Sequence, residues 1–252
     1  QKASKRSCEL IDSDFRPVPL MFHFSNKNGI FPLLNSTQTA INPHIKPKSS
    51  KGAPKRVKRT DCPSIPDIVE QLRERDMLPG IYIIFSRRGC DEAAARLQEF
   101  DLLSEQEAQY LQDYLLKFFL TDNPELQEAL LAFCWQENPK LQLKLLDAIA
   151  ENPHANQELF VFLQQHPEEK KKLWSFLATA SRVARIEQIE PLTRGIATHH
   201  AGLLPPWKEL VEKLFELGLV KIVFATATLA AGINMPARTT VISALSKRTD
   251  DG

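Results

Sequence analysis

Four short segments constrain the fold of this 252-residue chain more than any other feature. Residues 81–85 (IYIIF) and 220–225 (VKIVFA) are mostly apolar runs, which are typical of parallel strands covered on both faces. Shorter strands are predicted over 195–199 and 239–244. Helices are predicted over 65–78, 91–100, 206–217 and near Leu229. This alternation indicates an α/β fold with a parallel sheet, because parallel neighbours need crossover connections.

A different pattern occupies residues 101–180, between these elements. Asn-Pro or His-Pro dipeptides recur there at spacings of 15, 14 and 14 residues: Asn123-Pro124, Asn138-Pro139, Asn152-Pro153 and His166-Pro167. A capping residue before a first-turn proline is typical of a helix start. The pattern predicts four short stacked helices over 122–179, preceded by a longer helix over 102–120. We therefore expect an all-helical insertion at 101–180 between two parts of one α/β domain, 65–100 and 181–252.

The N-terminal end is strongly basic, although the formal net charge of the whole chain is only +1. Residues 1–60 hold 12 Lys/Arg against 3 Asp/Glu, whereas residues 101–180 hold 6 against 13, which indicates two surfaces with different partners. Residues 46–60 carry seven basic residues and no acidic one, and cannot bury enough apolar area to fold alone. We expect a basic mobile loop over 36–64, with a phosphate-binding arm as the alternative. Residues 1–35 are expected to form an entry segment and an edge strand.

The composition excludes several classes of protein. The chain is 43% hydrophobic and 25% charged, as is ordinary for globular proteins, and has no run of about 18 apolar residues that would predict a membrane span. Its four cysteines are scattered without CxxC spacing, which argues against a zinc site or a disulfide framework and favours a reducing compartment. The chain begins with Gln1 and shows no signal-peptide pattern, so we expect it to be a piece of a longer protein.

The first segment with candidate chemistry is FSRRGCD at 85–91, at the end of a predicted strand. Ligands gather at the carboxyl ends of strands in open parallel sheets. The hydroxyl of Ser86 and the guanidinium groups of Arg87 and Arg88 suit phosphate oxygens at a helix N-terminus. The alternative is that Ser86 and Asp91 only cap the helix while the arginines are solvated.

The second segment is HHAGLLP at 199–205. His199 and His200 offer hydrogen-bond donors, and Gly202 permits close approach of a backbone. A metal pair is not expected, because no third ligand follows at helical spacing. Ordinary turn chemistry is the alternative.

The third segment, FATATLAAGINMPAR at 224–238, is the most specific of the three. Thr226 and Thr228 follow the end of a strand, and Gly232 and Asn234 lie beyond a predicted short helix. Taken one by one, these residues could also be caps and a turn.

Together these segments resemble motifs IV, IVa and V of superfamily 2 helicases. The resemblance is greatest to the Ski-like DExH-box RNA helicases, whose second RecA-like domain carries FSRRGCD, HHAGLLP and ATxTLAxGxNMPAR in this order. Residues 11–20 resemble the passage from the first RecA-like domain into the second, and residues 246–252 (SKRTDDG) are similar to cyanobacterial and plastid members. The resemblance covers 10–34, 65–100 and 182–252. It implies a RecA-like parallel sheet flanked by helices, interrupted by the helical insertion.

The resemblance also implies roles for the residues of the three motifs. Those expected along the nucleic-acid backbone are Ser86, Arg87, Arg88, His199, His200, Gly202, Thr226 and Thr228. Gly232 and Asn234 are expected to face the ATP cleft. Backbone contacts of this kind position a strand without reading its sequence. Ala227 stands where many relatives have Glu, so no role of that acid is carried over.

Two motifs of an ATP-hydrolysing enzyme do not occur in these residues: the P-loop pattern G-x-x-x-x-G-K-[ST], and motif VI (QxxGRxGR), whose arginine would act on the transferred phosphate. Residues 91–94 (DEAA) are not a DEAD box, because five residues separate them from their strand. The resemblance implies that the parent is an ATP-dependent RNA helicase that binds ATP and Mg²⁺. This chain, truncated before motif VI, is expected to contain no catalytic residue and no metal site, and not to hydrolyse ATP alone.

The expected partners are single-stranded or partly structured RNA and the first RecA-like domain of the same protein. The expected location is the bacterial cytoplasm or a plastid, without membrane attachment. Two other hypotheses stay open. The acidic repeats at 122–179 could dock a protein partner on a non-catalytic α/β scaffold, or the substrate could be DNA, because no residue of the motifs visibly senses a 2′-hydroxyl.

Overall fold

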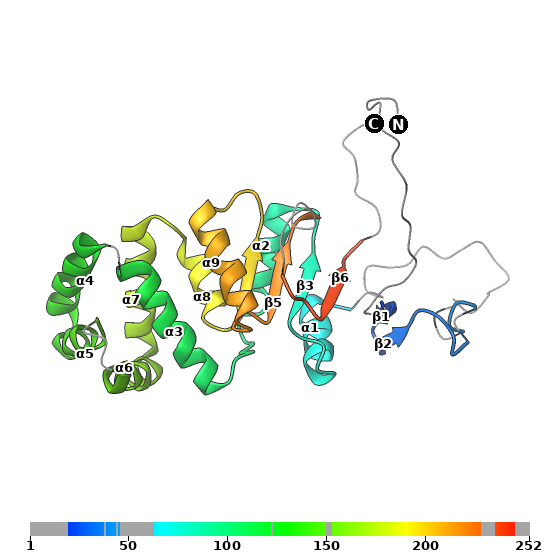
Figure 1. The fold of residues 1–252 in the computed structure, drawn as a ribbon, viewed down its shortest axis with the longest axis horizontal. Coiled ribbons are helices and arrows are strands. Elements are labelled where there is room, and N and C mark those ends of the chain that lie inside the picture. The colour runs from blue at the N-terminus through cyan, green and yellow to red at the C-terminus, as the bar shows by residue number, and fades with distance from the viewer. Residues whose placement is uncertain are drawn as a thin grey trace, which may run out of the picture. The chain divides into compact units, whose positions relative to one another are not determined.

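The computed structural model describes residues 20–37, 39–43, 45, 63–121, 123–149, 153–227 and 235–244 (Figure 1). The chain divides into two compact units, residues 1–71 and 72–252. Several predictions lie outside the described residues. They concern residues 1–19, the basic stretch 46–60, the helix near Leu229, and the site residues Thr228, Gly232 and Asn234.

The first unit contains a β-hairpin. Strand β1 (His23–Asn26) pairs antiparallel with β2 (Gly29–Pro32), and the amide of Asn28 donates to Asn26 Oδ1 over 2.7 Å in the turn. Gly29 has φ of 130°, a conformation that favours glycine. Helix α1 (Ile65–Glu74) begins after Ser64, whose backbone and side chain both donate to Asp67 Oδ2.

Four parallel strands form the sheet of the second unit, in the order β4-β5-β3-β6. They are β3 (Gly80–Ile83), β4 (Ile196–His199), β5 (Ile222–Ala225) and β6 (Thr239–Ile242). The register places Ile83 and His199 opposite Ala225, and Ile83 also opposite Ile242. The carboxyl ends of all four strands therefore share one edge. This arrangement confirms the α/β class and a RecA-like parallel sheet.

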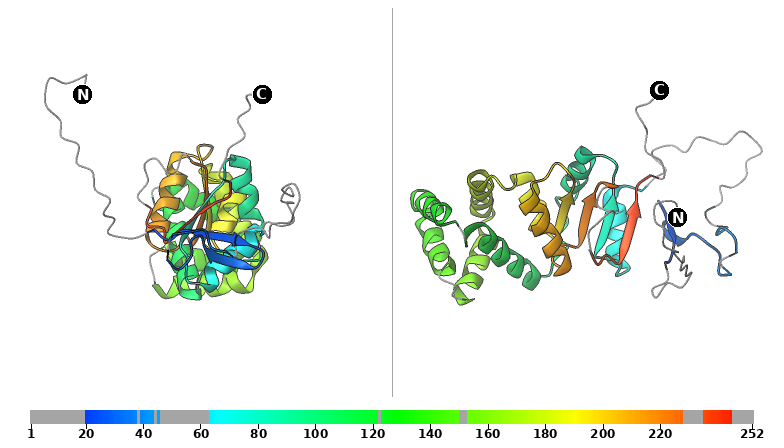
Figure 2. Two further views of the ribbon diagram at one scale, coloured as in Figure 1. Left: turned by 90° about the vertical axis from the view of Figure 1, so that its right-hand side faces the viewer. Right: turned by 45° about the horizontal axis from the view of Figure 1, so that its top comes forward.

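Helices cover the sheet on both sides (Figures 1 and 2). Helices α2 (Arg87–Ala95) and α8 (Ile186–Leu192) pack together on one face, and α9 (Pro205–Glu216) lies on the other, as right-handed crossovers require. Helix α2 begins four residues before its predicted start at Asp91. Helix α8, a short helix that contains Pro191, was not predicted from the sequence.

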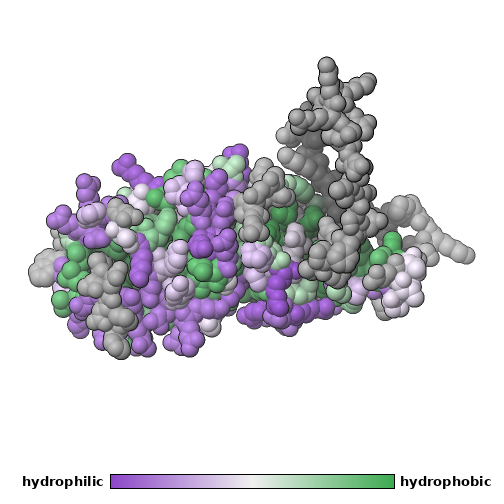
Figure 3. Space-filling view, viewed as in Figure 1, coloured by the Kyte–Doolittle hydropathy of each residue, from purple (hydrophilic) through white to green (hydrophobic). Residues whose placement is uncertain are grey.

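The segment between α2 and α8 is all helical in the residues that the structure describes. Its helices are α3 (Glu105–Leu120), α4 (Pro124–Glu137), α5 (Pro139–Ile149), α6 (Pro153–Gln165) and α7 (Pro167–Ser181). Each repeat helix begins at its proline, which confirms the predicted periodicity. In Figure 3, hydrophilic residues predominate on the visible face of this region. None of the described helices combines the length and apolarity needed to cross a membrane.

The capping prediction is confirmed for two repeats and wrong for a third. Asn123 Oδ1 accepts from the amide of Leu126 over 3.0 Å, and Asn138 Oδ1 accepts from that of Leu141 over 3.2 Å. His166 makes no such bond, because its ring stacks on Phe162 at a centroid distance of 4.2 Å and Nδ1 lies 2.8 Å from the Phe162 carbonyl. Asn152 lies outside the described residues.

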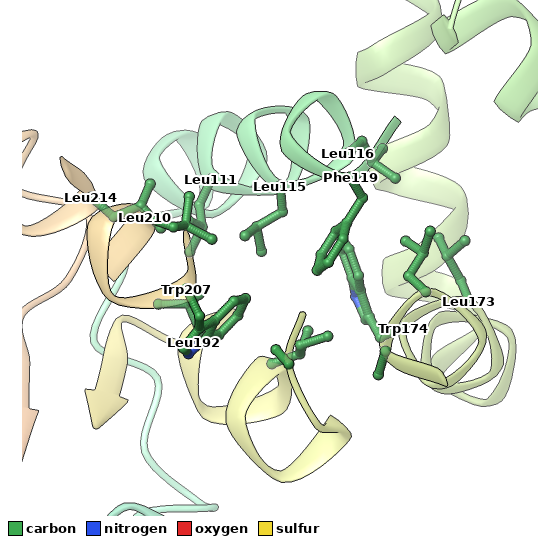
Figure 4. Packing of buried hydrophobic residues seen from close by; sticks show 14 of the residues in the cluster. Leu111, Leu115, Leu116, Phe119, Leu173, Trp174, Leu192, Trp207, Leu210 and Leu214 are labelled. Carbon is green, nitrogen blue, oxygen red and sulfur yellow. The ribbon is translucent and has the colours of Figure 1, made fainter. Parts of the chain in front are cut away.

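One hydrophobic core joins the helical segment to the sheet (Figure 4). The rings of Phe119 in α3 and Trp207 in α9 stack with centroids 6.5 Å apart, and Trp174 of α7 and Leu192 of α8 belong to the same buried cluster. Lys221 Nζ, next to β5, also forms an ion pair with Glu107 of α3. The helical segment is therefore packed into the same body as the sheet.

Candidate nucleic-acid interface

Three loops meet at the carboxyl edge of the sheet. The amide of Ile84 donates to the Ala225 carbonyl over 2.8 Å, and the amide of Thr226 donates to the His199 carbonyl over 3.3 Å. These bonds extend the pairing beyond β3 and β5 and bring the starts of the three loops side by side. The predicted site residues that the structure places at this edge are Ser86, Arg87, Arg88, His199, His200, Gly202 and Thr226.

Ser86 links the strand end to helix α2. Its Oγ accepts a hydrogen bond from the amide of Gly89 over 3.2 Å, so it is the N-cap of the helix. The side chain is exposed, and a hydroxyl that accepts one bond can still donate its own hydrogen. A Cβ on Gly89 would lie only 3.0 Å from Ile84 Cγ2, so glycine allows the helix to approach the strand. Asp91 does not cap the helix, which corrects the alternative prediction for that residue.

The two arginines of α2 differ in their surroundings. Arg88 Nε donates to Glu92 Oε1 over 2.7 Å, in an i,i+4 pair at the surface. Arg87 is exposed and forms no ion pair or side-chain hydrogen bond within the described part of the chain. Its Cδ would be 3.6 Å from a Cβ placed on Gly202, so its stem lies against the loop after β4. Among the described residues, Arg87 therefore presents a positive charge at the sheet edge that no acidic side chain pairs with.

The two histidines point to opposite faces of the sheet, as successive strand residues do. His199 Nε2 lies 2.7 Å from Glu212 Oε1 of α9, and His200 Nε2 lies 3.1 Å from Asp91 Oδ1 of α2. Both residues are buried, with 6% and 3% of their surface exposed. The structure thus turns both rings into the protein, away from the surface where the sequence placed a nucleic-acid contact.

The hydrogen bonds of His200 determine its tautomer. Its Nδ1 accepts from the amide of Gly202 over 3.1 Å, so the proton lies on Nε2, which donates to Asp91. Asp91 Oδ2 in turn lies 3.8 Å from Arg185 Nη2 at the start of α8. A Cβ on Gly202 would approach the His200 ring to 3.1 Å. Gly202 and His200 therefore fix each other, and the stem of Arg87 lies beside Gly202.

Burial lowers the pKa of His199, and the hydrogen bond to Glu212 opposes this shift only in part. The neutral imidazole is thus favoured, with its Nε2 proton directed to the carboxylate. Glu212, Asp91 and Arg185 are orienting residues that the sequence analysis missed. Asp91 lies 109 residues from His200, and no motif spacing signals such a contact.

The described groups at this edge are chemically suited to an anion. Within the described residues, no cluster of three or more His, Cys, Asp or Glu side chains could hold a metal ion. Ser86 offers a hydroxyl, Arg87 an exposed guanidinium and Thr226 a half-buried side chain. Such groups contact phosphate oxygens through hydrogen bonds and charge, without distinguishing bases.

A parallel sheet with the starts of these three segments at its carboxyl edge has the architecture of a RecA-like domain. No protein-family model matches the chain. It is 31% identical, over 95% of its length, to the chloroplastic DExH-box ATP-dependent RNA helicase DExH15 of Arabidopsis thaliana, of which it covers 19%. It is 27% identical over 95% of its length to the exosome RNA helicase MTR4 of Homo sapiens, again covering 19%. Against the antiviral helicase SKI2 of Saccharomyces cerevisiae, the identity is 29% over 74% of the chain and 10% of that protein.

The chain spans about a fifth or less of the length of these relatives. Over most of its own length it is a homologue of the Ski2-like DExH-box RNA helicases, as its motifs predict.

Proposed function

We propose that this chain is the part of an ATP-dependent RNA helicase that holds the RNA backbone and forms one wall of the ATP cleft between two RecA-like domains. The observation that carries the proposal is the meeting of three motif segments at one sheet edge, with the exposed Arg87 among them. The hydroxyl and guanidinium groups at this edge fit sequence-independent contacts with a nucleic-acid backbone, which movement along a strand requires.

In this proposal, the residues of the edge have two kinds of role. Ser86, Arg87, Arg88 and Thr226 contact phosphates. His199 and His200 act from inside, because their buried rings hold the loop that presents Gly202 and supports Arg87. Thr228 is proposed to join the phosphate contacts.

ATP and Mg²⁺ would be bound by the whole protein, with Gly232 and Asn234 facing the nucleotide. Closure of the two domains would then shift the RNA track with each ATP cycle. The chain alone should not hydrolyse ATP, since its sequence holds neither the P-loop pattern nor the arginine of motif VI. The test is ATP turnover by the purified chain with and without RNA. Turnover that Gly232→Ala abolishes would contradict this part of the proposal.

RNA binding over a salt series tests the backbone contact. Arg87→Ala should weaken binding of a single-stranded oligonucleotide about 5- to 30-fold, because a charge-assisted hydrogen bond is lost. It should also reduce the slope of log affinity against log salt by about 0.7. Arg96→Ala is the matched control, because Arg96 is an exposed arginine at the opposite end of the same helix. Equal losses in the two variants would contradict the proposal, as would no binding at low salt.

The same titration with DNA of matching sequence distinguishes the two nucleic acids. Tighter binding of RNA is expected. Equal or tighter binding of DNA would change the proposed substrate while keeping the backbone contact.

A further inference from the structure

A cavity of about 170 Å³ lies in the helical segment, among α3, α4, α5 and α6. Its apolar wall includes Leu116, Leu120 and Leu145. Its ionisable lining residues are Asp113 and Lys117, which follow one another by one turn of α3. All of these residues lie outside the edge described above, so the cavity is independent of the proposed RNA contact.

Asp113 is the unusual residue of this cavity. Its Oδ1 is fully buried and has no hydrogen-bond partner within the described part of the chain. Lys117 lines the cavity but is exposed, and forms no ion pair with Asp113 among the described residues. Burial raises the pKa of Asp113 to about 6, and the charge of Lys117 opposes that rise. An ionised carboxylate in such a place is costly unless a donor or cation meets it.

The uncharged polar side chains that line the cavity are Thr121, Gln127 and Asn156. The amide nitrogen of Gln127 donates to the Leu120 carbonyl at the end of α3. The acidic group of the lining is the Asp113 carboxylate, which lies beside an apolar wall. A cavity of roughly 150 Å³ can hold one benzene molecule. The space here therefore suits a ligand with a body of about that size.

We propose that this cavity binds a small organic cation, an ammonium or guanidinium group on an apolar body, with the cation against Asp113 and the body against Leu116, Leu120 and Leu145. A neutral apolar molecule would bring no donor or cation to the Asp113 carboxylate. The cation could be a free amine or the basic side chain of a protein segment, because the chemistry recognised is the same.

The test uses the 252-residue chain and two probes of equal shape, benzylamine and benzyl alcohol. Amide chemical shifts in a titration at neutral pH should change around Asp113, Leu120 and Leu145 with benzylamine. Benzyl alcohol should bind at least about tenfold more weakly, because it brings no charge to the carboxylate. Equal affinities for the two probes, or no shift with either at millimolar concentration, would overturn the proposal.

Variants locate the binding. Asp113→Asn should remove the preference for benzylamine, whereas Asp147→Asn, an exposed carboxylate on α5, should leave it unchanged. Ala148→Leu should fill the cavity and abolish binding while circular dichroism shows an unchanged helix content. Wild-type-like binding by Asp113→Asn, or by a folded Ala148→Leu protein, would contradict the site.

The pH dependence gives a further check. With a pKa of about 6, Asp113 is mostly ionised at pH 7 and mostly protonated at pH 5, so benzylamine affinity should fall about tenfold between them. Lys117 is the other ionisable residue that lines the cavity. A benzylamine affinity that does not change with pH would overturn the role of Asp113.

A comparison of arginine amide with short arginine-containing peptides separates the two possible sources of the cation. Tighter binding of a peptide indicates a protein segment, and equal binding indicates a free cation.

Discussion

At the scale of single residues, the end of β4 shows how strongly a backbone position can decide the role of a side chain. His199 and His200 are neighbours of the same type, yet one contacts Glu212 on α9 and the other Asp91 on α2. Both carboxylates hold the imidazole rings inside the protein. The expected consequence concerns His199, because its burial lowers the pKa of the imidazole.

His199 should make the stability of the second unit depend on pH. Its pKa is lowered in the folded state, so its contribution is complete above the unfolded pKa of about 6.5 and is lost as the pH falls through the folded pKa. The free energy of unfolding should therefore decrease between pH 7.5 and 5.5, and His199→Gln should reduce that decrease. Urea denaturation at pH 7.5 and at pH 5.5 measures the free energy of unfolding of the wild type and the variant.

His23→Gln is the control for this measurement, because His23 is exposed in the hairpin. It should leave the pH dependence as in the wild type. Identical pH profiles for the wild type and His199→Gln would show that the burial of His199 is not coupled to folding.

At the scale of elements, helix starts illustrate what a sequence pattern predicts and what it does not. The proline spacing predicts where α4 to α7 begin, because proline fits only the first turn. It does not predict that His166 leaves its capping position to stack on Phe162. Helix α8 is too short for a periodic apolar pattern, and Pro191 inside it indicates a break rather than a helix.

The cap of α5 has a measurable effect on stability. Asn138→Ala should lower the free energy of unfolding by about 1 kcal/mol, because the amide of Leu141 loses its acceptor. Asn138→Asp keeps an oxygen acceptor and should change the stability by less than about half of that. Urea denaturation of the three proteins measures the difference. An equal loss in both variants would show that the amide nitrogen of Asn138, rather than its cap oxygen, stabilises the helix start.

At the scale of the whole second unit, the continuous core predicts cooperative unfolding. Trp174 in α7 and Trp207 in α9 belong to the same cluster, which reaches the sheet through Val223 and Ala225. We expect the helical segment and the sheet to lose structure in one transition, since neither can keep its buried face without the other.

Fluorescence of variants that retain only Trp174 or only Trp207 tests this expectation against far-ultraviolet circular dichroism. In each variant, the midpoint of the fluorescence change should coincide with the midpoint of the circular dichroism change. If the Trp174 fluorescence midpoint lies at clearly lower denaturant than the circular dichroism midpoint of the same variant, the helices unfold as a separate unit.

The strands of the second unit could be predicted from the sequence, whereas contacts between distant segments could not. The parallel strands and their helices follow from apolar runs such as residues 81–85, because burial on both faces leaves a local pattern. The partners of His199 and His200 do not, since they lie 13 and 109 residues away and depend on how the sheet is wound. The cavity beside Asp113 is likewise a product of four helices, and no single repeat carries a sign of it.

The side chains at the end of β4 alternate between the two faces of the sheet. This alternation also restricts insertions and deletions in this region during evolution. Deleting one residue from the strand would exchange the faces of the two histidines, and would leave Glu212 and Asp91 facing the wrong side chains. A substitution disturbs one contact, whereas such a deletion disturbs both at once. We therefore expect natural variants to differ here in residue type before they differ in the number of residues between Gly195 and Gly202.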